Sequence, residues 1–301
     1  METRVLPFDE EAIAEAARLI LAGEPVAVAT ETVYGLAADA TNAEAVARIY
    51  EAKGRPSFNP LIIHIPDLPA AEYIGEFNED AHALAAQHWP GPLTLVVPLR
   101  ERAGIASLVT AGLPTVGLRV PAHPAMQALL RAAGRPLAAP SANASGSISP
   151  TRAEHVSKGL GGRIPLIIDA GPSERGLEST IVAATSNSLR LLRPGPISVD
   201  AREEGGSRIE APGQLASHYS PSKPLRFNAG QAGDDEYMIG FGAISGDANL
   251  SPAGDLLEAA ARLFDLLHQA DTSPKSRIAV ARVPDEGLGV AINDRLRRAA
   301  A

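Results

Sequence analysis

Hydrophobic and polar residues alternate along the first two-thirds of the chain with two different periods. Short apolar runs read as strands, and they alternate with longer segments whose apolar residues recur every three or four positions. The predicted strands are 26–29, 61–65, 93–97, 116–120, 166–168 and 180–182. The predicted helices are 10–22, 78–88, 124–133 and 152–159. This mixture predicts an α/β fold, and it leaves the order of the strands in the sheet open.

A further helix is predicted to end at a pair of cations. Thr41 and Glu44 have the spacing of a capping box at its start, and Lys53 closes its apolar face. Gly54 is expected to stop the helix in a left-handed conformation, and Pro56 cannot continue it. The cations of this turn are therefore held beside the predicted strand 61–65.

The alternating pattern breaks between Asp200 and Lys223, where the chain is polar and rich in glycine and proline. Such a composition is typical of a linker. Beyond it we predict strands 237–241 and 278–283 and two helices, one over 252–269 and one that ends near Ala300. The expected division is a catalytic domain over 1–200, a linker over 201–224 and a small α/β domain over 225–301. A unit this short is near the lower limit for an independent core, so we expect it to lean on the first domain.

Composition narrows the class of protein. The chain has 301 residues, 45% of them hydrophobic, which is typical of a globular protein. It has no cysteine, which excludes disulfides and thiolate metal sites and agrees with a reducing compartment. No segment reads as a signal peptide or a membrane span, so we expect a cytoplasmic protein without membrane contact. The net charge of −8 disfavours broad attraction to nucleic acid.

Lys53 and Arg55 stand two residues apart, with Ser57 and Asn59 following as neutral donors. Two fixed cations with such neighbours suit an anion with several oxygens, such as a polyphosphate. A solvated helix terminus is the alternative, because cations near a helix C-terminus also interact favourably with its dipole. This run of residues leaves both interpretations open.

Two further polar residues lie inside apolar strands. Arg119 follows Val116 in a short apolar run, and a buried guanidinium must find an anion because leaving it unpaired is costly. An internal salt bridge and a bound carboxylate would satisfy it equally well. His64 lies in the strand 61–65, where a histidine is more often a core residue than a ligand.

Clusters of small polar residues lie at the ends of several predicted strands. They are Thr30-Glu31-Thr32-Val33-Tyr34-Gly35, Pro140-Ser141-Ala142-Asn143, Glu178-Ser179-Thr180 and Arg193-Pro194-Gly195-Pro196. Each of them alone is compatible with a plain turn. Ligands of open α/β sheets bind at strand ends, however, so these clusters could form one site.

Several common motifs are absent from the sequence. It has no phosphate-binding G-x-x-x-x-G-K-[ST] loop, no G-x-G-x-x-G, no H-E-x-x-H and no G-x-S-x-G. The seven histidines are scattered without the spacing of metal ligands, so we predict no protein-built metal site. A widespread nucleotide or zinc fold is therefore not indicated.

Taken together, the motifs resemble the threonylcarbamoyl-AMP synthase family, the YrdC-like proteins, in its longer two-domain form. The matching segments of the first domain are Thr30-Glu31-Thr32-Val33-Tyr34-Gly35-Leu36, Lys53-Gly54-Arg55-Pro56, Asn59-Pro60-Leu61, Trp89-Pro90-Gly91-Pro92-Leu93-Thr94, Arg119-Val120-Pro121, Ser141-Ala142-Asn143, Ser179-Thr180-Ile181 and Arg193-Pro194-Gly195. His218-Tyr219-Ser220-Pro221 resembles the family's linker, and Ala291-Ile292-Asn293-Asp294-Arg295-Leu296 resembles its C-terminal end.

The resemblance implies a twisted mixed sheet with flanking helices, followed by a small Rossmann-like α/β domain. It also implies a nucleotidyltransferase that makes threonylcarbamoyl-AMP and pyrophosphate from L-threonine, bicarbonate and ATP. Mg²⁺ would accompany the ATP. A separate transferase would then pass the threonylcarbamoyl group to an adenosine of certain tRNAs, so tRNA would be only an indirect partner.

The resemblance also implies roles for individual residues. Lys53 and Arg55 would be catalytic and, with Ser141 and Asn143, would lie on the phosphates. The ATP site would be completed by Asn59, Thr115, Ser149, Arg193, His218 and Tyr219. Threonine would be held by Thr32, His64, Arg119, Ala139 and Ser179, with its carboxylate on Arg119. The linker would fold over the site as a lid.

Two other functions compete with this interpretation. A nucleic-acid-binding module would need an extended basic face with aromatic residues, and the chain is acidic with only 4% aromatic residues. The carbamoyl-transfer domain of hydrogenase maturation proteins shares the fold, but those proteins are much longer and carry cysteine-based zinc motifs. Neither competitor accounts for the whole set of segments.

Overall fold

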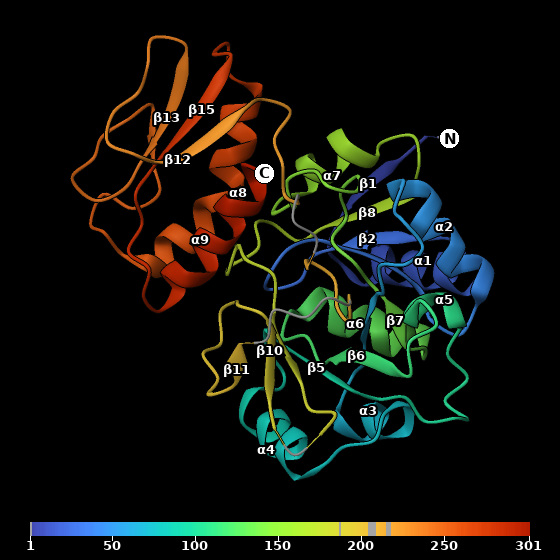
Figure 1. The fold of residues 1–301 in the computed structure, drawn as a ribbon. Coiled ribbons are helices and arrows are strands. Elements are labelled where there is room, and N and C mark those ends of the chain that lie inside the picture. The colour runs from blue at the N-terminus through green and yellow to red at the C-terminus, as the bar shows by residue number, and fades with distance from the viewer. Residues whose placement is uncertain (1, 187, 204–208, 215–217) are drawn as a thin grey trace.

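The computed structural model describes residues 2–186, 188–203, 209–214 and 218–301, and it has two sheets (Figure 1). The larger sheet has eleven strands. Their spatial order is β1 (Arg4–Pro7), β8 (Leu166–Asp169), β2 (Val26–Val28), β3 (Gly35–Asp39), β7 (Leu137–Ala138), β4 (Ile62–His64), β6 (Thr115–Arg119), β5 (Leu93–Pro98), β9 (Thr180–Ala183), β10 (Arg190–Arg193) and β11 (Arg202–Glu203). Parallel and antiparallel pairs are mixed, which confirms the expected mixed sheet.

Helices cover both faces of the larger sheet. The side chains of a strand alternate between its two faces, and two core clusters follow this alternation. Val26 and Val28 pack with α1 (Glu10–Leu21) and α6 (Pro124–Ala133), whereas Ala27 packs on the other side with α2 (Ala43–Lys53) and α7 (Ala153–Leu160). The helices α3 (Leu68–Ile74), α4 (Glu79–His88) and α5 (Ser107–Thr110) contribute to the second of these cores.

The smaller sheet has four parallel strands in the order β12 (Leu225–Ala229), β15 (Arg277–Ala281), β13 (Glu236–Gly240) and β14 (Ala248–Asn249). Two helices, α8 (Leu256–Thr272) and α9 (Leu288–Ala299), lie between this sheet and the rest of the molecule (Figure 1). The unit is thus a parallel sheet with two helices, of which α8 connects β14 to β15, and this confirms the small α/β domain that was expected.

The small unit does lean on the larger one. A single hydrophobic cluster joins its helices to Val33, Ile148 and Leu177 of the larger unit. Across the same junction Arg152 donates to Asp265 with an N–O distance of 2.7 Å, and Arg295 donates to Glu178 at 2.8 Å. The two units therefore share buried surface as well as ion pairs.

Helix termini show where local sequence decides the structure. Gly54 ends α2 with φ of +60°, as predicted, and α6 begins at Pro124, as predicted. The predicted capping box of Thr41 is wrong. Asn42 caps α2 by accepting hydrogen bonds from two backbone N–H groups, while the Thr41 hydroxyl donates to Asp39.

Candidate functional site

A single cavity gathers the polar clusters at one edge of the larger sheet. Its wall includes Thr30 and Thr32 after β2, Arg55 after α2, Ser141 after β7, and Arg193 at the end of β10. Glu178 and Ser179 precede β9 rather than follow a strand. They still reach the cavity, because β9 is antiparallel to β10 and its start lies beside the end of β10.

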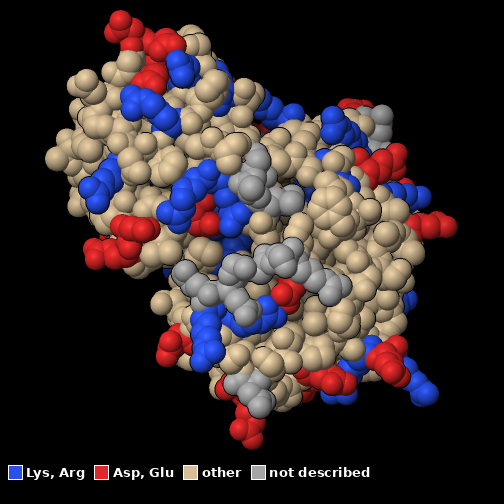
Figure 2. Space-filling view, in the orientation of Figure 1, with Lys and Arg blue, Asp and Glu red and all other residues tan. Residues whose placement is uncertain are grey.

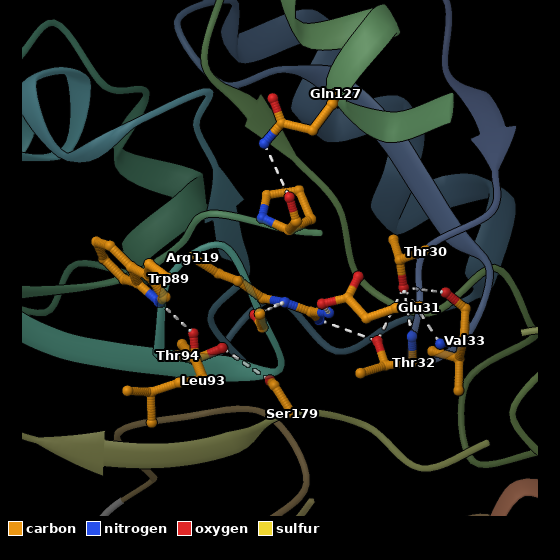
Figure 3. Close-up of polar contacts among 12 residues, drawn as sticks. Thr30, Glu31, Thr32, Val33, Trp89, Leu93, Thr94, Arg119, Gln127 and Ser179 are labelled. Atoms are coloured by element: carbon orange, nitrogen blue, oxygen red, sulfur yellow. Dashed lines mark hydrogen bonds and ion pairs between the residues drawn. The ribbon is translucent and has the colours of Figure 1, made fainter. Parts of the chain in front are cut away.

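One end of the cavity is built on the neighbouring parallel strands β4 and β6. His64 and Arg119 lie opposite each other in the register of this pair. The Arg119 guanidinium donates to Glu31 Oε1 at 2.6 Å and to Thr32 Oγ1 at 3.0 Å (Figure 3). Arg119 therefore has an internal salt bridge, and its Nε donates to the carbonyl oxygen of Gly91 at 3.3 Å.

Charge at this end is balanced. Burial alone would raise the pKa of Glu31, but the neighbouring Arg119 charge outweighs burial and holds that pKa below its ordinary value. Burial, followed by the charge of Arg119, lowers the pKa of His64 well below its usual range, so the imidazole is neutral. Both ring nitrogens of His64 are buried without a hydrogen-bond partner among the described residues.

The hydroxyl residues Thr30, Thr32 and Ser179 form part of the cavity wall. Thr94 Oγ1 and Ser179 Oγ lie 2.7 Å apart in a buried hydrogen bond (Figure 3). Thr30 donates from its hydroxyl to the carbonyl oxygen of Val33 at 2.6 Å, which fixes the turn that carries Thr32. These groups offer small donors and acceptors close to Arg119.

The other end carries cations without carboxylate partners. Arg55 donates to the carbonyl oxygens of Asn59 and Pro60, and Arg193 donates to those of Ser179 and Pro212. In the described part of the chain, no carboxylate forms a salt bridge with either of them. Burial lowers the pKa of Arg55 to about 10, and burial also lowers the pKa of Arg193. Figure 2 shows Lys and Arg side chains gathered on this face, where the two units meet.

Lys53 lies behind the wall of the cavity. It is 2% exposed, and its Nζ donates to the carbonyl oxygens of Ser141 and Asn143, each at 2.6 Å. Burial, followed by the charge of Arg55, lowers its pKa well below the ordinary value. The idea of a solvated helix terminus is therefore wrong for Lys53 and for Arg55, which is 9% exposed.

The linker covers the cavity. Pro212, Gly213, His218 and Tyr219 are part of its wall. Gly213 has φ of +87°, and a Cβ placed there would lie 2.9 Å from Arg193 Cδ, so this close approach requires glycine. The Ser220 N–H donates to the carbonyl oxygen of Gly146 at 2.7 Å, which ties the linker to the loop after β7.

The cavity unites most, but not all, of the predicted site residues. Those in its wall are Arg55, Ser141, Arg193, His218, Tyr219, Thr32, His64, Arg119, Ala139 and Ser179. The others, Lys53, Asn59, Asn143 and Ser149, are buried behind the wall. Thr115 lines a neighbouring cavity that shares Ile62 and Pro212 with the first one.

Sequence reasoning missed three charged residues of this region: Glu31, Glu178 and Arg295. Glu31 and Glu178 stand inside the polar clusters, where they looked like turn residues. Arg295 follows Ala291 by four positions and Ile292 by three, so it lies on the apolar face of a predicted helix. The argument that singled out Arg119 applies equally to this arginine, and it could have found it.

Among the described residues, no group of three or more His, Asp or Glu side chains is arranged to hold a metal ion. The two carboxylates at the cavity are already engaged, Glu31 by Arg119 and Glu178 by Arg295. None of the described helices is both long enough and apolar enough to cross a membrane.

Comparisons with known proteins agree along the whole chain. Residues 18–195 match the family model of the Sua5, YciO and YrdC proteins, which carries the description Telomere recombination. Residues 181–301 match the model for the C-terminal domain of threonylcarbamoyl-AMP synthase.

Two similar proteins come from Bacillus subtilis and Pyrococcus abyssi. The threonylcarbamoyl-AMP synthase of Bacillus subtilis is 41% identical over 99% of this chain and 95% of its own length. The enzyme of the same name from Pyrococcus abyssi is 39% identical over 97% of this chain and 95% of its own length. The crystal structure of P. abyssi Sua5 complexed with L-threonine superposes with a TM-score of 0.92 at 37% identity, covering 99% of this chain and 98% of that one.

Proposed function

This chain belongs to the Sua5, YciO and YrdC family, and we propose that it is a threonylcarbamoyl-AMP synthase. The reaction joins L-threonine, bicarbonate and ATP and yields threonylcarbamoyl-AMP and pyrophosphate. The observation that carries the proposal is the charge of the cavity. One end, with Arg119, Glu31 and neutral His64, has balanced charge, and the other end has unbalanced cations.

These two ends match the two larger substrates. Threonine is a zwitterion without net charge, and it would lie among Thr32, His64, Arg119, Ala139 and Ser179. The triphosphate of ATP is strongly anionic, and it would lie against Arg55, Arg193 and Ser141. Charge-assisted contacts from arginine to phosphate are among the strong hydrogen bonds of proteins.

The remaining predicted ATP residues would act around this contact. Lys53 would add positive charge from beneath the loop at Ser141 and Asn143, whose carbonyl oxygens it holds. Thr115 would meet the nucleoside in the neighbouring cavity. The buried residues Asn59, Asn143 and Ser149 would shape the wall, and His218 and Tyr219 would close it from the linker.

The chemistry requires positioning more than a covalent nucleophile. The threonine ammonium first loses a proton, and bicarbonate takes up a proton and loses water to give CO₂. The free amine forms an N–C bond to this CO₂ and releases a second proton, and an oxygen of the resulting carbamate attacks the α-phosphorus. The Pα–O bond to the β-phosphate breaks, and pyrophosphate leaves with that electron pair. Fixed cations stabilise the charge that develops on the phosphates. Because they are already in position, no free energy of reorganisation is needed when the reaction occurs. Mg²⁺ would arrive with ATP, held by phosphate oxygens and water.

We also propose a division of labour along the chain. Residues 1–200 would form the catalytic domain, 201–224 the lid, and 225–301 the small C-terminal domain. A closed lid would keep water from the labile carbamate and the mixed anhydride. The product would pass in the cytoplasm to a separate transferase that modifies an adenosine of tRNA, so that tRNA itself would not need to bind here.

A pyrophosphate-release assay tests the proposed function. With ATP, the purified chain should release pyrophosphate only when threonine and bicarbonate are both present, and threonylcarbamoyl-AMP should accumulate in equal amount. Serine serves as the matched control substrate, because it lacks only the methyl group of threonine. Equal release with serine, or release without any amino acid, would refute the assignment of the substrate.

A further inference from the structure

A completely buried arginine of the C-terminal unit contacts residues of the cavity wall. Arg295 of α9 is 0% exposed. Its Nε donates to Glu178 Oε2 at 2.8 Å, and its Nη2 donates to the carbonyl oxygen of Pro194 at 3.0 Å. Pro194 directly follows Arg193, so one guanidinium contacts Glu178 of the cavity wall and the neighbour of Arg193, another wall residue. Its Nη1 donates to Asp294 at 2.7 Å on its own helix.

Glu178 connects Arg295 to Ser149, a residue predicted to bind the nucleotide. Its second oxygen accepts a hydrogen bond from Ser149 Oγ at 2.5 Å. Burial alone would raise the pKa of Glu178, but the charges of Arg295 and Arg193 outweigh burial and keep that pKa below its ordinary value. Both carboxylate oxygens therefore act as acceptors, and Ser149 is held by an anion that Arg295 stabilises.

The same helix also holds the linker in place. The Arg295 guanidinium carbon lies 5.2 Å from the centre of the Tyr219 ring, a cation–π distance. The His218 N–H donates to the carbonyl oxygen of Arg298 at 3.1 Å, one turn further along α9. Tyr219 lines the cavity, so α9 supports the lid from behind exactly where the lid meets the site.

We infer that Arg295 is a positioning residue for the nucleotide end of the site. It holds Glu178 with Ser149 on one side and Tyr219 of the lid on the other, so the C-terminal unit is a working part of the ATP site. The inference rests on the proposed function and deepens it. A purely structural ion pair between the units is the alternative, and it predicts an equal effect on both substrates.

Steady-state kinetics of the full chain separate the two roles. Arg295→Met keeps the length of the side chain and removes its charge, and Arg295→Lys keeps the charge and loses the fork of donors. We expect Arg295→Met to raise the KM for ATP about tenfold, equivalent to about 1.4 kcal/mol. The KM for threonine should stay within about twofold, because the Arg119 guanidinium donates to Thr32 and Glu31 rather than to Glu178. Arg295→Lys should fall between Arg295→Met and the wild type.

Arg297→Met is the matched control. Arg297 lies on the same helix two positions later and is exposed, so the control changes the same charge without touching the site. It should leave both KM values unchanged. If Arg295→Met matched this control, or raised both KM values equally, the positioning role would be wrong.

The pH profile gives a second readout that a merely structural role would not move. Without Arg295, burial is less opposed and the pKa of Glu178 rises, so the carboxylate is protonated at higher pH. The acidic limb of kcat/KM for ATP should therefore shift to higher pH in Arg295→Met, and this shift should vanish when Glu178→Gln is added. An unshifted limb would contradict the relay through Glu178.

Folding is the remaining concern, since Arg295→Met leaves a buried carboxylate unpaired. The double variant Glu178→Gln with Arg295→Met removes that carboxylate charge and keeps the test possible. Its KM for ATP should exceed that of Glu178→Gln alone, because the support of Tyr219 is also lost. No difference between these two variants would overturn the role of Arg295 at the lid. A wild-type chain without threonine-dependent pyrophosphate release would instead refute the proposed function, whatever the variants do.

Discussion

The two ends of the cavity solve the problem of a buried cation in opposite ways. Arg119 is 4% exposed and has its own carboxylate partner, Glu31. Arg193 is also 4% exposed, but its guanidinium meets only neutral oxygens among the hydrogen-bond partners identified in the described residues. A balanced end suits a molecule without net charge, and an unbalanced end suits an anion. The number of arginines in a pocket is therefore less informative than the number that lack a counter-ion.

The largest effect is expected from breaking the balanced end. Arg119→Met leaves Glu31 buried without its cation and should lower the free energy of unfolding by about 3 kcal/mol or more. Adding Glu31→Gln removes the stranded charge and should restore most of that stability, but not threonine binding. Chemical denaturation and calorimetric titration with threonine measure the two quantities. Full threonine affinity in the double variant would remove Arg119 from the threonine site.

Removing an unbalanced cation should act on the other substrate. Arg55→Met and Arg193→Met should each weaken ATP binding about a hundredfold, because a charge pair in a cleft is worth roughly 4 kcal/mol at an effective dielectric of 20 and part of it remains through neighbouring cations. Neither cation forms a salt bridge with a described carboxylate, so stability should fall less than in Arg119→Met. Direct titration with ATP checks this. Undiminished ATP affinity in both variants would contradict the contrast between the two ends.

Proton uptake should distinguish the buried amine from the arginines. Because burial and Arg55 lower the pKa of Lys53 well below 10.5, an approaching phosphate should raise it again. In a series of titrations at pH values below 10.5, ATP binding should then take up a fraction of one proton where Lys53 is partly deprotonated in the free chain. Titration in two buffers of different ionisation enthalpy measures this uptake, and Lys53→Met should abolish it. Arg100→Met, a change far from the cavity, is the control and should leave the uptake as in the wild type.

The smallest effect concerns acid pH. The pKa of Glu31 is lowered from its ordinary value of 4.5, so its contribution to stability is fully present above that value. That contribution is lost as the pH falls through the lowered pKa of the folded state. Between neutral pH and about pH 3, the wild type should lose about 1 kcal/mol more than the variant with both Glu31→Gln and Arg119→Met. Parallel denaturation curves at both pH values test this, and equal losses would show that the pair does not control the acid response.

The fold could be predicted where local sequence and packing agree. The apolar runs that became β4, β5, β6, β8 and β9 were recognised because β-branched residues dominate them. The strand β3 was missed, since Gly-Leu-Ala-Ala-Asp has little intrinsic preference for a strand. It is extended because β2 and β7 pair with it on both sides. Such long-range pairing cannot be recognised from the local sequence of the strand.

The sequence could predict which residue types form the site, but not which groups each of them contacts. A cation in an apolar strand had to meet an anion, and Arg119 does so with Glu31. The sequence left an internal partner and a bound carboxylate equally open, because nothing in the spacing of residues 31 and 119 brings them together. Lys53 is a similar case, since its carbonyl partners belong to a loop ninety positions away and depend on the tertiary fold. The choice of Asn42 over Thr41 as a cap follows from Asp39, which captures the Thr41 hydroxyl.

The pairing of His64 with Arg119 across β4 and β6 has a consequence for how this pocket can change over time. Successive residues of a strand point to opposite faces, so inserting or deleting a single residue in either strand would turn one of the two side chains away from the pocket. Substitutions can change the side chains at the amino-acid end of the cavity one at a time. An insertion or deletion in either strand cannot do so, because it displaces the whole strand register. We therefore expect relatives that accept another amino acid to differ by replacements in these two strands, and to absorb their insertions in the surrounding loops.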